Sequence, residues 1–294
     1  MIVYKRMDNK QNPYVKSIVS GVAVVGEMTL GGLFLENLKM EKQRTSKPYP
    51  FLARQMLSQG IKGFEAGLVP WGIIIGLGKG TSLGLAHSTI KNKCAQHDLS
   101  PSTTTYLAGF GAGGFQGACI SPLMLARTRV NEVIATRPKA GTWGEEIKMS
   151  TSVLNTVIKK EGLYSLFNGM GATVMKRSFD WGLRFGIKSH IETYIHKYDH
   201  DMSPTAVSLG SAFASGALSA LITTPVDRVI PLLQSSNGTG VGTLLKEKIS
   251  TEGYSTLFRG YGIRAIHTGW HTTFAIFVAD ALYKKVYNVT NSSK

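Results

Sequence analysis

Residues 225–230 read PVDRVI and residues 252–260 read EGYSTLFRG, and a similar pair of stretches occurs twice more in the chain. The counterparts are FLENLK at 34–39 with QGIKGFEAG at 59–67, and PLMLAR at 122–127 with EGLYSLFNG at 161–169. The final glycines of the longer stretches lie 102 and 91 residues apart. So long a period is not that of a solenoid of small units. It predicts three similar two-helix modules around a pseudo-threefold axis.

These stretches resemble the mitochondrial carrier family, whose repeats carry a Pro-x-acid-x-x-base element followed by a Glu-Gly-(x)4-aromatic-Arg-Gly element. The resemblance covers about residues 14–287 and implies an all-α membrane protein of six tilted transmembrane helices. The repeats are expected at 14–94, 102–198 and 203–288, within one integrated transmembrane domain. Short matrix-side surface helices are expected in the connecting segments 49–59, 142–160 and 242–251.

Composition alone indicates a membrane protein less clearly than the repeated motifs do. The 294 residues are 43% hydrophobic and their mean hydropathy is +0.01. Several windows nevertheless approach the length needed to span a bilayer: 15–40, 68–90, 103–125, 206–226, 263–286 and, more weakly, 171–191. These windows are rich in small residues, which let transmembrane helices approach closely. A soluble, glycine-rich helical protein of two domains is the alternative.

The chain is basic, with 33 Lys and Arg against 18 Asp and Glu and a formal net charge of +15. Basic residues are dispersed rather than interleaved with aromatic residues in one loop, which argues against single-stranded nucleic acid as a partner. The charge suits an anionic bilayer, with cardiolipin as the expected lipid, and a small anionic metabolite as cargo. Two cysteines exclude a disulfide framework and a Cys-based zinc site. We expect a monomer.

In the family that the chain resembles, the acid of each repeat pairs with the base of the next, which closes a matrix gate. Carried over, the resemblance pairs Glu36 with Arg127 and Asp227 with Lys39, and places Met124 against Ile230. Both charges of the third pair are absent together, so neither partner is left as an unpaired buried charge, which is the costly case. Polar residues one turn beyond each base are expected to brace the gate: Gln43, Asn131 and Gln234. The alternative is a set of unrelated charge pairs at helix ends.

The opposite, cytoplasmic gate should use a second acid and base near the ends of the even-numbered helices. Counting 20 and 23 residues from each motif glycine gives these positions: His87 and Ile90, Ser189 and Glu192, Asp280 and Tyr283. Almost nothing of an ion-pair ring remains there. We therefore expect a weak gate at this end.

Cations recur on one face of the even-numbered helices, and they are the candidate substrate-binding residues: Lys79, Lys176, Arg177, Arg184 and Arg264. An unpaired cation within a membrane is expensive, so it is a functional candidate by default, and Arg can grip a carboxylate bidentately. Snorkelling to lipid headgroups is the alternative. It fits poorly for residues several turns inside a helix.

Two further polar residues belong to the same candidate site. Glu27 stands in an apolar helix and either lines the cavity or is buried against Ser, Thr or backbone groups. His267 lies four residues before His271, as metal ligands often do on a helix, but no third ligand is apparent. We therefore predict that the histidines line the cavity, and we expect no metal site.

The resemblance is narrower at GLVPW (67–71), DWGLRFG (180–186) and GWHT (269–272), which are similar to the fungal citrate–oxoglutarate and tricarboxylate branch of the family. It implies exchange of di- or tricarboxylates, citrate above all, across the inner mitochondrial membrane, with oxoglutarate as a candidate counter-substrate. No hydrolase elbow, P-loop or HExxH motif is present, so we expect neither enzymatic activity nor a cofactor. Two alternatives remain, a mitochondrial nucleic-acid-associated membrane protein and a degenerate carrier that acts as a scaffold.

Overall fold

The computed structural model describes residues 11–44, 47–58, 60, 68–134, 143–199, 201–235, 246, 249–251, 253–258 and 260–292. Within helices, only the backbone is described at 40, 43–44, 131–134, 226–235, 255–256 and 288–292. Every regular element in this part of the chain is a helix, which confirms the all-α prediction.

The helices follow one another along the chain in this order. The first long helix consists of α1 (Pro13–Glu27), a π-helical turn η1 (Met28–Gly32) and α2 (Leu33–Arg44). The central elements are α3 (Tyr49–Leu57), η2 (Leu68–Gly72), α5 (Ile73–Gln96), α6 (Pro101–Ile134), α7 (Trp143–Glu161), η3 (Leu163–Phe167) and α8 (Met170–Tyr198). The last elements are α9 (Pro204–Ser235), η4 (Tyr254–Phe258), α11 (Tyr261–Thr272), η5 (Thr273–Val278) and α12 (Ala279–Ser292).

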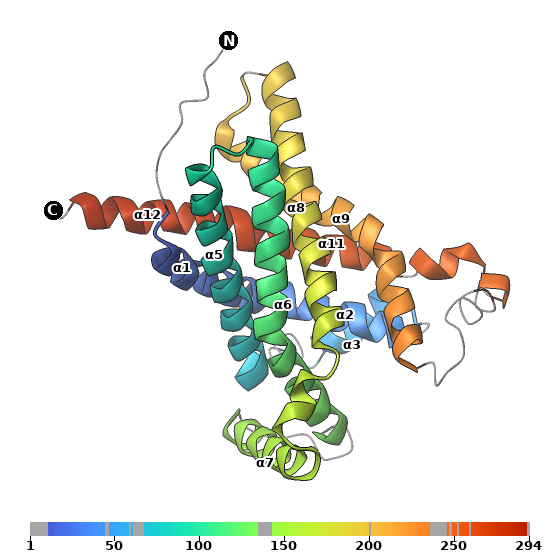
Figure 1. The fold of residues 1–294 in the computed structure, drawn as a ribbon. Helices are drawn as coiled ribbons and strands as arrows, with labels where there is room; N and C mark the ends of the chain where they lie inside the picture. The colour runs from blue at the N-terminus through green and yellow to red at the C-terminus, as the bar shows by residue number, and fades with distance from the viewer. Residues whose placement is uncertain are drawn as a thin grey trace.

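The long helices contact one another in a closed circuit. Helix α1 packs on α5, α5 on α6, α6 on α8, α8 on α9, α9 on α11, and α12 returns to α1. Figure 1 shows α5, α6 and α8 side by side, with α7 across one end of this group. The circuit brings residues from the two ends of the chain to the same interior space.

The first long helix bends at a pair of glycines. Its start is fixed by Asn12, whose side chain accepts hydrogen bonds from the backbone N–H groups of Tyr14 and Val15. Fifteen residues of regular helix end at Glu27, and Gly31 then adopts a φ of 107°. A left-handed conformation of this kind is cheap only for glycine. The first long helix therefore bends at the Gly31-Gly32 step.

Glycine also sets how closely the helices of each successive pair approach. A Cβ atom at Gly80 of α5 would overlap the carbonyl of Ser20 in α1, and one at Gly113 of α6 would overlap the carbonyl of Arg177 in α8. A Cβ atom at Gly216 of α9 would meet the carbonyl of Thr268 in α11. The same type of contact thus recurs in all three helix pairs, at close backbone-to-backbone distance.

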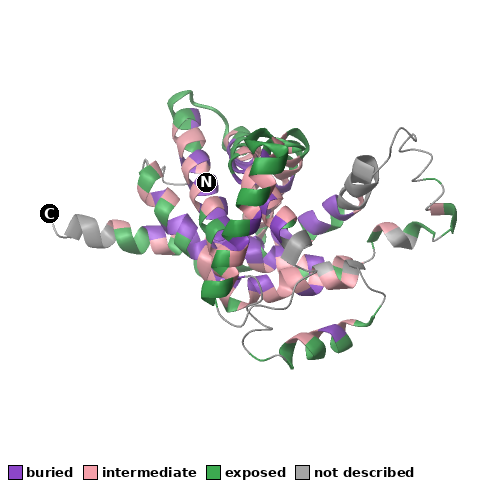
Figure 2. Ribbon diagram, turned by 90° about the horizontal axis from the view of Figure 1, so that it is seen from below, coloured by how far each residue is buried: buried purple, intermediate pink, exposed green. Residues whose placement is uncertain are grey.

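The molecule buries charge and exposes apolar side chains. Lys79 and Arg184 are each 6% exposed, whereas Val22, Ile222 and Met175 are more than half exposed. Figure 2 shows buried segments concentrated where the helices converge. Three of the described helices are long and apolar enough to cross a membrane: Pro13–Lys39, Leu68–Gln96 and Pro204–Pro225. This distribution suits a lipid environment around a polar interior.

Candidate functional site

A cavity of about 140 Å³ lies inside the circuit of helices. A single water needs roughly 10–15 Å³, so the space has room for a small metabolite rather than for one ion. Its walls are formed by these residues: Glu27, Met28, Glu36, Lys39, Lys79, Met124, Lys176, Arg177, Asp180, Arg184, Arg264, His267, Thr268 and His271. All seven residues predicted to bind substrate are among them, from α1, α5, α8 and α11.

The cavity carries a surplus of positive charge. Its wall holds six cationic side chains and three carboxylates, an excess of three positive charges with both histidines neutral. Some of these charges offset one another, because Asp180 lies on the same helix as Lys176, Arg177 and Arg184. The net field nevertheless favours a multiply charged anion, since low-dielectric walls strengthen the attraction.

Arg184 is the cation whose surroundings point most directly to a ligand. Its side chain is buried, and in the described part of the chain neither Nε nor Nη1 has a hydrogen-bond partner. No described carboxylate lies within 4.0 Å of it. Buried donors without partners are costly, so a guanidinium left in this state beside a polar cavity is suited to an anion.

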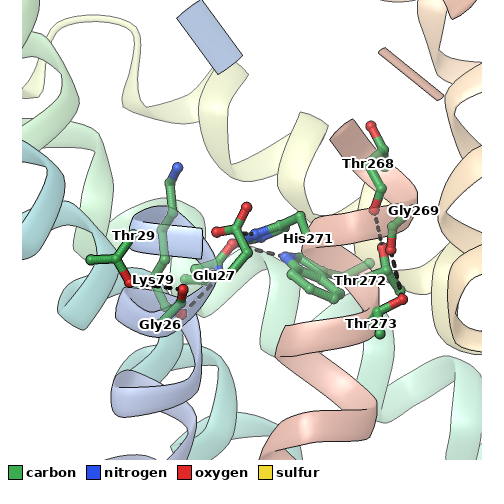
Figure 3. Close-up of polar contacts among 11 residues, drawn as sticks. Gly26, Glu27, Thr29, Lys79, Thr268, Gly269, His271, Thr272 and Thr273 are labelled. Atoms are coloured by element: carbon green, nitrogen blue, oxygen red, sulfur yellow. Dashed lines mark hydrogen bonds and ion pairs between the residues drawn. The ribbon is translucent and has the colours of Figure 1, made fainter. Parts of the chain in front are cut away.

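Glu27 reaches from α1 toward α11, where its Oε2 lies 3.2 Å from Nδ1 of His271. Figure 3 shows Glu27 between Lys79 and His271. The other oxygen, Oε1, is buried and has no hydrogen-bond partner among the described residues. The carboxylate occupies space that a Cβ atom on Gly32 would fill. The bend in the first long helix therefore makes room for this side chain.

Comparison with known sequences supports an assignment to a family. A sequence model of the family described as mitochondrial carrier protein matches residues 99–199 and again 201–290. The chain belongs to the mitochondrial carrier family.

Relatives of this carrier include proteins named for carboxylates. It is 26% identical over 247 residues to the citrate/oxoglutarate carrier protein of Saccharomyces cerevisiae, covering 80% of this chain and 77% of that one. It is 24% identical over 295 residues to mitochondrial citrate transporter E of Aspergillus niger, covering 91% and 92%. It is 25% identical over 253 residues to the mitochondrial oxaloacetate transport protein of Saccharomyces cerevisiae, covering 79% and 74%.

One end of the carrier's cavity is bordered by the residues predicted to form a matrix gate. Nη1 of Arg127 in α6 lies 3.7 Å from Oε1 of Glu36 in α2, and both side chains are largely buried. Lys39 lines the cavity beside Glu36. The remaining predicted gate residues, Asp227, Gln43, Asn131 and Gln234, have side chains that lie outside the described part of the structure, as does Ile230.

Ion pairs are also present at the other end, where almost none was predicted. Lys16 of α1 pairs with Asp280 of α12, and Lys188 pairs with Glu192 one turn along α8. The prediction counted positions only along the even-numbered helices, so it missed Lys16, which comes from the first helix. The Lys16–Asp280 ion pair therefore connects the first and last long helices of the carrier at this end.

Two stacked rings line a second, outer cavity. The imidazole of His87 stacks on Phe185 with 4.2 Å between ring centroids. Both residues line an outer cavity of about 170 Å³, which also contacts Lys188 and Asp280, and neither lines the central cavity. The stacked rings thus belong to the outer cavity, whereas the Glu36–Arg127 pair borders the central one.

Sequence reasoning missed two kinds of site residue in this carrier. Asp180 is acidic and was quoted only as part of a motif, although it lines the cavity wall. Met124, expected as an uncharged gate position, accepts a contact from Nη2 of Arg177 at 3.7 Å. Spacing on α8 could have suggested Asp180, since it lies four residues after Lys176 and four before Arg184.

Proposed function

We propose that this carrier exchanges di- and tricarboxylates across the inner mitochondrial membrane by alternating access, with citrate as principal substrate and oxoglutarate as counter-substrate. The observation that carries the proposal is the central cavity, whose wall has three more cationic than acidic side chains. Citrate has three carboxylates and would neutralise that excess. Arg184, buried with two nitrogens lacking partners among the described residues, is the natural first contact.

The names of several relatives support a carboxylate rather than another anion. Relatives from yeast and Aspergillus niger are named for citrate, oxoglutarate and oxaloacetate. At identities of 24–26%, the names of the relatives do not distinguish one carboxylate from another. The distinction therefore rests on the residues of this cavity. The excess of positive charge favours the tricarboxylate among them.

The proposed membrane arrangement follows from the circuit of helices. We assign six spans to α1–α2, α5, α6, α8, α9 and α11–α12, grouped as repeats 14–94, 102–198 and 203–288. At about 1.5 Å per residue, the 29 residues of α8 extend over roughly 44 Å, which exceeds a hydrocarbon core of about 30 Å. Helices α3 and α7 would lie on the matrix surface near cardiolipin, around a monomeric bundle.

Alternating access requires the two ends of the cavity to open in turn. On the matrix side we assign Glu36–Arg127 and Asp227–Lys39 as ion pairs that open, braced by Gln43, Asn131 and Gln234. Substrate can drive this change only through different affinity for the two states. The cations Lys79, Lys176, Arg177, Arg184 and Arg264, with His267 and Glu27, would supply that difference by closing around the anion.

Reconstitution in liposomes tests the function directly. We expect rapid uptake of labelled citrate into vesicles loaded with citrate or oxoglutarate, and little uptake into empty vesicles. Lys79→Ala should reduce the exchange rate at least about tenfold, because the lost cation is buried in the wall. The matched control is Lys285→Ala, which removes an exposed lysine of α12. No exchange of any carboxylate by correctly inserted protein would overturn the proposal, and equal rates for both variants would remove Lys79 from the site.

A further inference from the structure

The Arg184 guanidinium lies over the indole ring of Trp181, with 4.7 Å between its central carbon and the ring centroid. Such stacking is favourable for a cation, especially away from water. This contact uses no N–H donor in a conventional hydrogen bond, so the donors of the guanidinium are left for another partner. Two of those nitrogens have no partner among the described residues, as noted above.

Trp181 is itself held in one orientation. Its side chain is fully buried, and its Nε1 donates a hydrogen bond of 2.8 Å to Oε1 of Gln116 in α6. Gln116 is 1% exposed, and its Nε2 donates a hydrogen bond of 2.8 Å to the backbone carbonyl of Lys79 in α5. One amide therefore joins three helices through two buried bonds.

This chain of contacts connects two cations of the cavity wall. Lys79 and Arg184 both line the cavity, whereas Gln116 and Trp181 do not. The close approach of α6 and α8 that permits the contact depends on Gly113, where a Cβ atom would lie 2.9 Å from Cβ of Trp181. Fully satisfied buried polar networks fix geometry, because breaking any bond leaves an unpaired group.

We propose that Gln116 and Trp181 are positioning residues for the anion site: they hold the Arg184 guanidinium against the indole ring, with its unpartnered donors beside the cavity, at a position fixed relative to the backbone of Lys79. The inference rests on the proposed transport of carboxylates. It adds that the contribution of Arg184 to anion binding depends on a buried hydrogen-bond chain outside the cavity wall. A guanidinium that is already held in place loses little freedom on binding, which favours affinity.

Kinetics of Trp181→Phe and Gln116→Leu in liposomes test this assignment. We expect KM for citrate to rise about tenfold, as for one misplaced charged hydrogen bond, while the maximal rate changes less than about twofold. The matched control is Trp270→Phe, which removes another indole N–H, one with no hydrogen-bond partner among the described residues. It should leave KM unchanged.

A double-mutant cycle with Arg184→Lys separates positioning from general packing. In that background Trp181→Phe should raise KM no further, because the residue through which it acts has already been altered. Additive effects of the two substitutions on KM would overturn the inference. So would a fall in the maximal rate that parallels a loss of folded protein while KM stays unchanged. Should Gln116→Leu not fold, Trp181→Phe and the cycle still decide. Absence of carboxylate exchange by the unaltered carrier would instead reject the proposed function.

Discussion

Glu27 and His271 form a buried polar pair. Removing either side chain would leave a buried polar group of the other without this partner. Glu27 is 1% exposed and its only described side-chain hydrogen bond, of 3.2 Å, is to His271. Glu27→Ala should lower the thermal unfolding midpoint in detergent by about 2–6 °C, because it leaves the imidazole buried without its partner. Glu27→Gln, which keeps an acceptor, should lower the unfolding midpoint less.

The pairing can be separated from the effect of a cavity by a second substitution. In a His271→Ala background, Glu27→Ala should lower the unfolding midpoint by less than it does in the unaltered protein, since the contact no longer exists. Equal costs in the two backgrounds would show that Glu27 stabilises the carrier in another way.

At the scale of elements, the bend in the first long helix places Glu27. Gly32→Ala should displace the carboxylate, because the new methyl group would occupy its position, and Gly31→Ala should strain a backbone held at a φ of 107°. We expect either change to lower the citrate exchange rate and the unfolding midpoint together.

Gly26→Ala is the control in the same helix, since a Cβ atom there meets nothing within 4 Å. Its effect should be neutral or slightly stabilising. A similar loss in all three variants would assign the effect to the helix in general.

The elements also show what the sequence could reveal and what it could not. The all-α fold was predictable, because apolar windows and motif spacing are local properties of the sequence. The cations of the cavity were predictable from their positions on one face of α5, α8 and α11. The Gln116–Trp181 bond was not, since it depends on the register between α6 and α8. Lys16 and Asp280 lie 264 residues apart, and no local pattern connects them.

At the scale of the whole carrier, the Glu36–Arg127 pair joins α2 to α6 and borders one end of the cavity. Glu36→Arg or Arg127→Glu alone would place two like charges about 4 Å apart in a largely buried position, so each should abolish most of the exchange activity. The double reversal restores an attractive pair and should recover at least about tenfold more activity than either single change. Liposome exchange at equal protein incorporation provides the comparison.

The same reversal applied to a surface pair gives the control for that experiment. Arg129 and Glu161 lie 3.5 Å apart, and each side chain is 41% exposed. Exposed pairs contribute only about 0–1 kcal/mol, so single and double reversals there should change exchange little. If the interior pair behaves like the surface pair, Glu36 and Arg127 are neighbours without a gating role. If the double reversal recovers activity only at the interior pair, opening and closing of the carrier depends on a specific attraction between α2 and α6, and the substrate anion must compensate for its loss whenever that end opens.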